Sequence, residues 1–124
     1  MKLAVLAALM AIALPAPALA ADWVPAANSI DGNMFYIDRQ SIRTMPNGYK
    51  RVWEQVDYAK TDKFGDTGAK RYREYDCIER RVRFLSINYF KGNEVTSTDG
   101  RGSDWNYISP ESINESLFQF VCRR

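Results

Sequence analysis

The chain contains no histidine, and this absence removes much of ordinary enzyme chemistry. Histidine is the most frequent general base of enzymes and the most frequent metal ligand of proteins. A glycine-rich phosphate loop, a G-x-S-x-G nucleophile motif and a paired-carboxylate motif are also missing. Asp66-Thr67-Gly68 matches the D-T-G of aspartic proteases, but a loop between two strands explains this tripeptide better. We therefore expect no enzyme, no cofactor and no metal.

Long hydrophobic runs are also scarce, because the only one lies at the N-terminus. Lys2 precedes an apolar run from Leu3 to Leu14, which is shorter than the roughly 20 residues of a membrane-spanning helix. Ala18-Leu19-Ala20 then provides a small-x-small cleavage site. This pattern predicts a secretory signal peptide over residues 1–20, with a buried N-terminal helix as the alternative. Residue 21 is alanine rather than cysteine, so we expect no bacterial lipid anchor and an intact mass that begins at Ala21.

Cysteine is limited to Cys77 and Cys122. Thiols of exported proteins are usually oxidised, and two cysteines allow a single disulfide. In the chain-entropy model, closing the loop from residue 77 to residue 122 contributes about 4 kcal/mol. The alternative, a pair of metal ligands, needs further ligands, and histidine is not available. The sequence therefore predicts one structural disulfide.

Excess charge is lacking too, since the formal net charge is only +2. This value does not fit the strongly basic composition of a nucleic-acid-binding domain. About 100 residues remain after residue 20, enough for one small domain, 21–124. Aromatic residues make up 13% of the chain and recur in short alternating runs, which is typical of a half-buried sheet.

Turn residues divide this domain into short strands. Pro46-Asn47-Gly48 and Gly92-Asn93 predict hairpin turns. Residues 35–38, 70–78, 81–90, 94–98 and 105–108 have the pattern of strands. In the strand over residues 49–59, Val52, Val56 and Tyr58 share one face with Glu54. The other face carries Arg51, Trp53, Gln55 and Asp57.

The pattern changes to helical spacing after residue 108. Ser109 is a suitable N-cap and Pro110 suits the first helical position. Further along, one apolar stripe is formed by Ile113, Leu117, Phe118 and Val121. The predicted fold class is α+β: a small antiparallel β-sheet with one C-terminal α-helix packed on a face, tied by a single disulfide.

The segment around Cys77 predicts a hairpin. We expect residue 77 to lie opposite 82, 76 opposite 83 and 75 opposite 84, with a turn at Glu79-Arg80 or over residues 78–81. Tyr75, Cys77, Val82 and Phe84 would then face the helix. After residue 84 the apolar residues change to the other face of the strand, which a bulge or a strand buried on both faces would explain. The predicted core aromatics are Trp53, Tyr75, Phe84 and Phe118.

A basic strip covers residues 70–83, where six basic residues stand against three acidic ones. Two interpretations remain open, a site for an acidic or sulfated ligand and an ordinary solvated strand face. Arg71 and Arg73 share the phase of Tyr75, but we expect the sheet edge to expose them. The candidate ligand-binding residues are Lys70, Arg71, Arg73, Arg80, Arg81 and Arg83.

Four segments resemble the surface-adhesin protein E family of Gram-negative bacteria. These segments are YIDRQSI, RVWEQVDY, YDCIERRVRFLSINYFKGNEV and DWNYISPESINESLFQFVC. Their order and spacing cover nearly all of the chain from Trp23 to Cys122. The resemblance implies an antiparallel sheet, a C-terminal helix and the Cys77–Cys122 bridge.

The resemblance also implies a function. The adhesin that names the family binds host vitronectin and laminin, the former through a basic segment that corresponds to Lys70–Arg83 in this chain. We therefore expect an exported, non-catalytic binding domain, in the periplasm or at the cell surface, with vitronectin, laminin or sulfated glycans as partners. The alternative is a soluble periplasmic accessory or inhibitor domain, for example one that blocks a host lysozyme. The oligomeric state stays undetermined.

Overall fold

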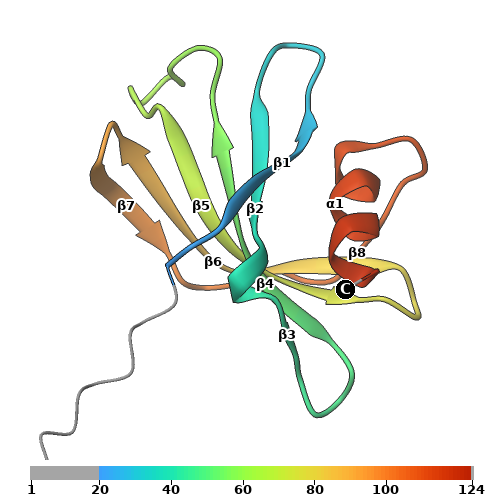
Figure 1. Ribbon diagram of the computed structural model, residues 1–124. Helices are drawn as coiled ribbons and strands as arrows, with labels where there is room; N and C mark the ends of the chain where they lie inside the picture. Colours follow the sequence, from blue (N-terminus) through green and yellow to red (C-terminus); the bar gives the residue numbers. More distant parts are fainter. Residues whose placement is uncertain (1–19, 124) are drawn as a thin grey trace, which may run out of the picture.

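In residues 20–123, a single antiparallel sheet carries one helix on its concave face (Figure 1). The computed structural model describes residues 20–123, so the predicted signal peptide lies almost entirely outside the described residues. The predicted α+β fold is confirmed. Within residues 20–123 the main strand order is β1-β2-β4-β5-β6-β7, while β3 pairs with β4 and β8 with β6. The elements are β1 (Trp23–Asn28), β2 (Met34–Asp38), η1 (Arg39–Ser41), β3 (Arg43–Thr44), β4 (Lys50–Asp57), β5 (Gly68–Asp76), β6 (Arg81–Lys91), β7 (Glu94–Asp99), β8 (Asn106–Tyr107) and α1 (Ile113–Cys122).

The first strand, β1, is absent from the sequence-based assignment. It carries Pro25, a residue that cannot donate a ladder hydrogen bond and is confined to edge strands and bulges. Both conditions hold, because β1 pairs only with β2 in the main strand order and its register shifts between Pro25 and Ala27. Pro25 is therefore the reason why the sequence pattern did not predict this edge strand.

The core lies between the concave face and α1. Strand β4 buries Val52, Glu54 and Val56, as the alternation predicted. The helix buries Leu117, Phe118 and Val121 of its predicted stripe. The core cluster is formed by Ile37, Val52, Tyr75, Val82, Ile108, Leu117, Phe118 and Val121. Burying these apolar side chains supplies most of the stabilisation of so small a domain.

The helix begins later than the sequence indicated. Ser112, not Ser109, is the N-cap, and its side-chain oxygen accepts a hydrogen bond from the backbone N–H of Glu115 at 3.1 Å. The backbone carbonyl of Ser109 instead accepts a hydrogen bond from the Ser112 hydroxyl at 2.7 Å. Both serines have the chemistry of an N-cap. The positive φ of 60° at Glu111 shows that the chain still turns before the helix starts.

The β5–β6 hairpin has a different register from the one predicted. Asp76 lies opposite Arg81 and Tyr75 opposite Val82, so the turn covers Cys77 to Arg80. Arg80 ends that turn with φ 55°, in the left-handed region. A shift of this size leaves each side chain on its predicted face, because strand side chains alternate with period two. The predicted change of phase is a bulge: Arg73 pairs with Phe84 but Tyr72 pairs with Ser86.

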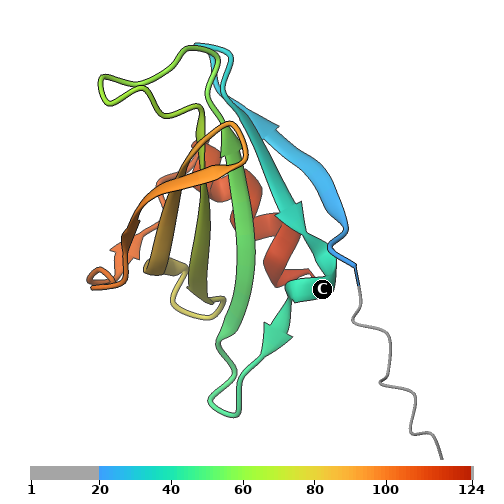
Figure 2. The same cartoon turned by 90° about the vertical axis from the view of Figure 1, so that its left-hand side faces the viewer.

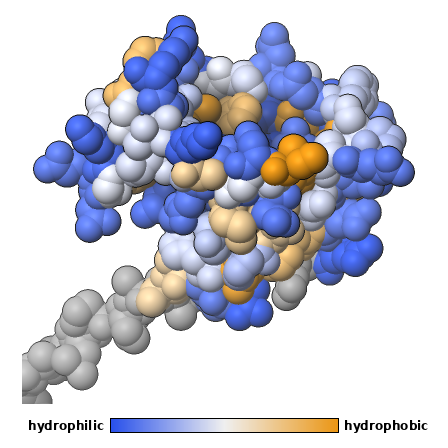
Figure 3. All heavy atoms as spheres, turned by 90° about the horizontal axis from the view of Figure 1, so that it is seen from above, coloured by the Kyte–Doolittle hydropathy of each residue, from blue (hydrophilic) through white to orange (hydrophobic). Residues whose placement is uncertain are grey.

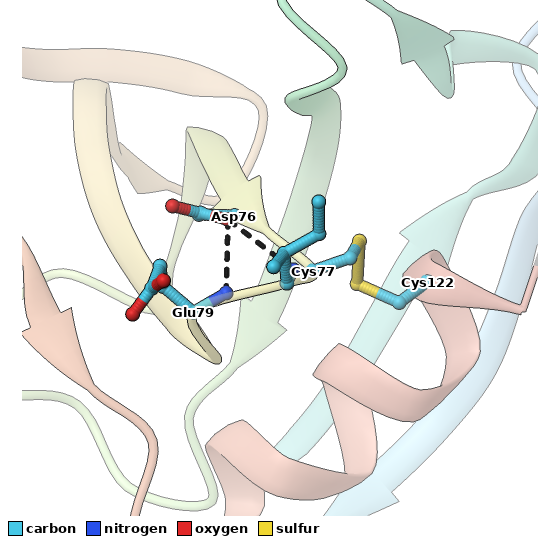
Figure 4. The surroundings of a disulfide bond; sticks show 5 residues. Asp76, Cys77, Glu79 and Cys122 are labelled. Atoms are coloured by element: carbon cyan, nitrogen blue, oxygen red, sulfur yellow. Dashed lines mark hydrogen bonds between the residues drawn. A yellow bond between two sulfur atoms is a disulfide. The ribbon is translucent and has the colours of Figure 1, made fainter.

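Cys77 and Cys122 form the predicted disulfide, with their Cα atoms 5.7 Å apart (Figure 4). Cys77 stands in the turn rather than in the strand, and Cys122 is the last residue of α1. Asp76 shapes this turn, since its Oδ1 accepts hydrogen bonds from the backbone N–H groups of Ile78 and Glu79 at 3.2 and 3.1 Å. The bridge therefore joins the end of the helix to a hairpin turn.

Two of the four predicted core aromatics lie outside the core. Tyr75 and Phe118 are buried as predicted. Trp53 lies on the convex face of β4, where it stacks on Tyr72 with ring centroids 4.8 Å apart. Phe84 is only half-buried, because its ring covers the guanidinium of Arg73 at 4.9 Å rather than packing into the helix.

Candidate binding surface

Alternation along β5 and β6 divides the basic strip between the two faces of the sheet. Arg71 and Arg73 share the concave face with Tyr75, while Arg81 and Arg83 lie on the convex face. The expectation that the sheet edge would expose Arg71 and Arg73 is wrong. Strand β5 is central in the sheet, with β4 and β6 on either side. Arg73 is 1% exposed.

On the concave face the arginines surround Glu54, which is also 1% exposed. Arg71 Nη2 donates to Glu54 Oε1 at 2.7 Å, and Arg73 Nη1 donates to the same oxygen at 3.2 Å. The Tyr75 hydroxyl donates to Glu54 Oε2. Arg73 also reaches the helix, where its Nη2 donates to Asn114 Oδ1 at 2.9 Å. Three of these contacts meet at one carboxylate and join β4 to β5, and the fourth extends the network to α1.

The charges of this buried network favour ionised Glu54. Burial raises the pKa of the Glu54 carboxyl, but the nearby guanidiniums of Arg73 and Arg71, together with the hydrogen bonds from Tyr75 and Arg71, lower it by more. Burial and the Glu54 charge raise the pKa of Tyr75 well above its usual value. The tyrosine therefore stays protonated and acts as a donor. Arg71 and Arg73 are therefore engaged in contacts inside the domain.

The convex face holds a second cluster, in which two buried carboxylates position exposed arginines. Glu74 is 1% exposed and accepts from Arg51 Nε at 2.7 Å and from Arg83 Nη2 at 2.6 Å. Asp76 is also buried, and its Oδ2 accepts from Arg81 Nε at 3.0 Å. Burial raises the pKa of Asp76, but hydrogen bonds from the Glu79 backbone and the Arg81 side chain lower it overall.

Aromatic rings cover one side of these guanidiniums. The Trp105 ring lies 4.6 Å from Arg81 Cζ and 4.4 Å from Arg83 Cζ, and Tyr49 packs edge-on against Trp105 at 5.2 Å. Stacking on an aromatic face and pairing with a carboxylate fix the plane of an arginine side chain. We name this set, consisting of Tyr49, Arg51, Glu74, Asp76, Arg81, Arg83 and Trp105, the arginine–tryptophan cluster.

Two members of the predicted set stand apart from this cluster. Arg80 lies in the turn, pairs with Glu115 of α1 at 3.0 Å and covers the Phe118 ring at 4.8 Å. Lys70 lies near the other end of β5, where its ammonium stands over the rings of Phe90 and Trp23. Of the six candidates, the structure therefore brings only Arg81 and Arg83 together, and these two lie on the convex face. Sequence reasoning missed Tyr49, Arg51 and Trp105 as their neighbours.

Comparison with known proteins decides the family. The model of the surface-adhesin protein E family matches residues 23–123. The chain belongs to this family. Membership supports an exported, surface-exposed binding protein of the adhesin class rather than an enzyme. No curated protein sequence gives a significant match.

Solved structures show the same fold at low sequence identity. Crystal form II of Haemophilus influenzae protein E matches with a TM-score of 0.59 and 12% identity, covering 89% of this chain and 94% of that one. A second structure of Haemophilus influenzae protein E gives a TM-score of 0.58 and 11% identity, with 89% and 90% covered. At such identity the likeness establishes the fold and leaves the ligand open.

Membrane and metal features are absent from the part of the chain that the structure describes. Between residues 20 and 123, no helix has the length and apolar character needed to cross a membrane. Within the same residues, acidic and cysteine side chains do not gather in threes around a common metal position.

Proposed function

We propose that the chain is an exported, non-catalytic adhesin domain that binds host vitronectin or laminin through the arginine–tryptophan cluster. The observation that carries the proposal is the way Arg81 and Arg83 are held. Their side chains are 26% and 34% exposed, yet both are fixed by buried carboxylates and by Trp105. A side chain that is already ordered loses less conformational entropy when a ligand binds.

Unused donors support an acidic or sulfated ligand. Arg83 gives Nε and Nη2 to Glu74, and Arg81 gives Nε to Asp76 and Nη2 to the Tyr49 hydroxyl. Among residues 20–123, Nη1 of either arginine has no hydrogen-bond acceptor. Each Nη1 can therefore donate to a carboxylate or a sulfate-like anion, and hydrogen bonds between two charged groups are among the strongest in proteins. Three arginines also outnumber the two carboxylates of the cluster, which leaves a local excess of positive charge.

A test of this surface must not leave a buried charge without its partner. Replacing Arg80, Arg81 and Arg83 by serine would leave buried Asp76 without its arginine and buried Glu74 with Arg51 alone, and the loss of a partner from a buried charge is strongly destabilising. The double substitution Arg83→Gln with Glu74→Gln avoids this difficulty. It removes one positive and one negative charge together, so the total charge of the domain is unchanged.

We expect this double variant to bind immobilised vitronectin about tenfold more weakly than the unmodified domain at low salt, because a charge-assisted hydrogen bond is lost. The difference should shrink as salt rises, since solvent-exposed charges are screened. Binding would be measured by surface plasmon resonance, with heparin as a second probe and thermal unfolding as the check on folding.

The control removes net positive charge at the other end of the sheet. Lys60 and Lys63 are exposed in the β4–β5 loop, and Lys60→Ser with Lys63→Ser lowers the net charge by two without touching the cluster. This control should retain most of the affinity. Unchanged binding in the folded Arg83→Gln, Glu74→Gln variant, or an equal loss in the lysine control, would assign the arginines to an ordinary solvated face.

A further inference from the structure

A pocket lies on the convex face at the end of β5 far from the arginine–tryptophan cluster. The β6–β7 hairpin leans across β4 and β5 (Figure 2). Its bend follows from a bulge, because Tyr89 pairs with Ser97 but Phe90 pairs with Val95, which leaves Thr96 unpaired. The hairpin turn and the ends of β4 and β5 border an open hollow with a volume of about 270 Å³. The pocket is lined by Gln55, Asp57, Thr67, Gly68, Ala69, Lys70, Phe90, Gly92 and Asn93.

Hydrogen bonds from the β4–β5 loop fix the hairpin in this position. Thr67 donates its backbone N–H to the Phe90 carbonyl at 2.7 Å, and its hydroxyl accepts from the Gly92 N–H at 2.9 Å. The Thr96 hydroxyl donates to Asp66, which is buried. The turn itself follows from Gly92, whose φ of 59° suits the first position of a two-residue hairpin loop. The pocket is therefore preformed.

The lining offers both donors and acceptors in a small space. Gln55 Nε2 donates to Asp57 Oδ1 at 2.8 Å, which leaves the Gln55 carbonyl and Asp57 Oδ2 as acceptors. Lys70 lies directly opposite Gln55 and supplies ammonium donors. Its charge has no salt-bridge partner among residues 20–123 and is held over the Phe90 and Trp23 rings at 5.0 and 5.7 Å. One wall is the apolar ring of Phe90.

The charge and the size of the pocket limit the ligand. Asp57 and Lys70 balance each other, so the lining favours a neutral molecule over an ion. The volume is below the roughly 300–1,000 Å³ of pockets for drug-sized molecules, so it suits one small ring. The loop end of the domain, seen from above, is largely hydrophilic with apolar side chains scattered among polar ones, which does not favour a broad apolar partner (Figure 3).

We propose that this pocket binds a neutral pyranose unit of a glycan. Each hydroxyl of a sugar is both donor and acceptor, and Gln55, Asp57 and Lys70 together offer both kinds of group. The C–H face of the ring would lie against Phe90. The site is independent of the proposed adhesin surface, because it shares no residue with the arginine–tryptophan cluster.

The test is a nuclear magnetic resonance titration of the 15N-labelled domain. The probes are methyl glucopyranoside and methyl galactopyranoside as neutral sugars, glucuronate as an acidic sugar and inositol as a polyol without a ring oxygen. We expect saturable shifts with a neutral pyranoside, at amides of residues 67–70 and 90–93. The dissociation constant should be on the order of millimolar, as expected for so few contacts.

Two variants check the assignment. Asp57→Asn keeps the shape of an exposed side chain, and Lys70→Met keeps an unbranched stem between the two rings, so both should fold. Each should weaken binding about tenfold through one lost charge-assisted hydrogen bond, whereas Lys60→Ser should change nothing. The proposal fails if no pyranoside gives saturable shifts, if only glucuronate binds, if inositol binds equally well, or if both variants bind like the unmodified domain. None of these outcomes bears on the proposed vitronectin-binding surface, because the pocket shares no residue with the arginine–tryptophan cluster.

Discussion

Replacing Glu54 by alanine should lower the free energy of unfolding by about 3–5 kcal/mol, measured by urea denaturation at neutral pH. The change removes the one carboxylate that Arg71, Arg73 and Tyr75 share on the concave face. Arg73 would remain 1% exposed without its anionic partner. Leaving such a charge buried and unpaired is the main cause of the expected loss.

Acid provides an independent check on the same residue. The folded-state pKa of Glu54 is lowered, so ionised Glu54 contributes stability above its unfolded-state pKa of about 4. That contribution is lost as the pH falls through the lower folded-state value. The gap between the unmodified domain and Glu54→Ala should therefore narrow in acid.

A double substitution serves as the matched control. Glu54→Leu with Arg73→Met removes both charges of a buried pair, and apolar replacement of such pairs is often neutral or stabilising. We expect this variant to be clearly more stable than Glu54→Ala. If Glu54→Ala loses less than about 1 kcal/mol, or if the double variant is no better, the network on the concave face does not hold the domain together.

Replacing Cys122 by serine should cost about 2–5 kcal/mol. The bridge joins the last residue of α1 to the β5–β6 turn, and the residues between them include β6, β7, β8 and the helix. Opening so long a loop gives the unfolded chain much more freedom. The helix end would also lose its only covalent tie to the sheet, so amide hydrogen exchange in α1 should accelerate.

The other cysteine supplies the control. Cys77→Ser and the double Cys77→Ser, Cys122→Ser variant should lose about as much stability as Cys122→Ser, because any one substitution breaks the same bond. A larger loss for one single variant would point to packing of that side chain instead. An oxidised sample that reacts with a thiol reagent once denatured would show that the bridge is not formed.

The spacing of apolar residues and the composition were sufficient to predict the fold class, the disulfide and the apolar stripe of the helix. Alternation placed Glu54 on the apolar face of β4, and the same rule placed Arg71 and Arg73 on the face of Tyr75. These two facts together indicate a cross-strand ion pair, since Glu54 lies opposite Arg71 in the sheet. The prediction of exposed arginines failed because the sequence does not show which strand is central.

Other features depended on geometry that no local pattern specifies. The hairpin register was wrong because a four-residue turn starting at Cys77 and one starting at Ile78 keep the same faces. Trp105 lies far along the chain from Arg81 and Arg83, and only the return of β8 beside β6 brings its loop to them. The binding role of the six basic candidates stays a prediction, with Arg81 and Arg83 in the position that suits it best.

One measurement tests directly whether the two faces of the basic strip have different roles: arginine-specific dicarbonyl labelling with mass spectrometry, in the presence and absence of vitronectin. In the free domain Arg83 and Arg80 should react readily, whereas Arg71 and Arg73 should not, because Glu54 and the core enclose them. Vitronectin should protect Arg81 and Arg83 but not Arg39, which is 45% exposed, lies beside Asp22 at the β1–β2 side of the sheet and serves as the internal control. Ready labelling of Arg73 in the folded domain, or equal labelling of Arg83 with and without vitronectin, would contradict this division.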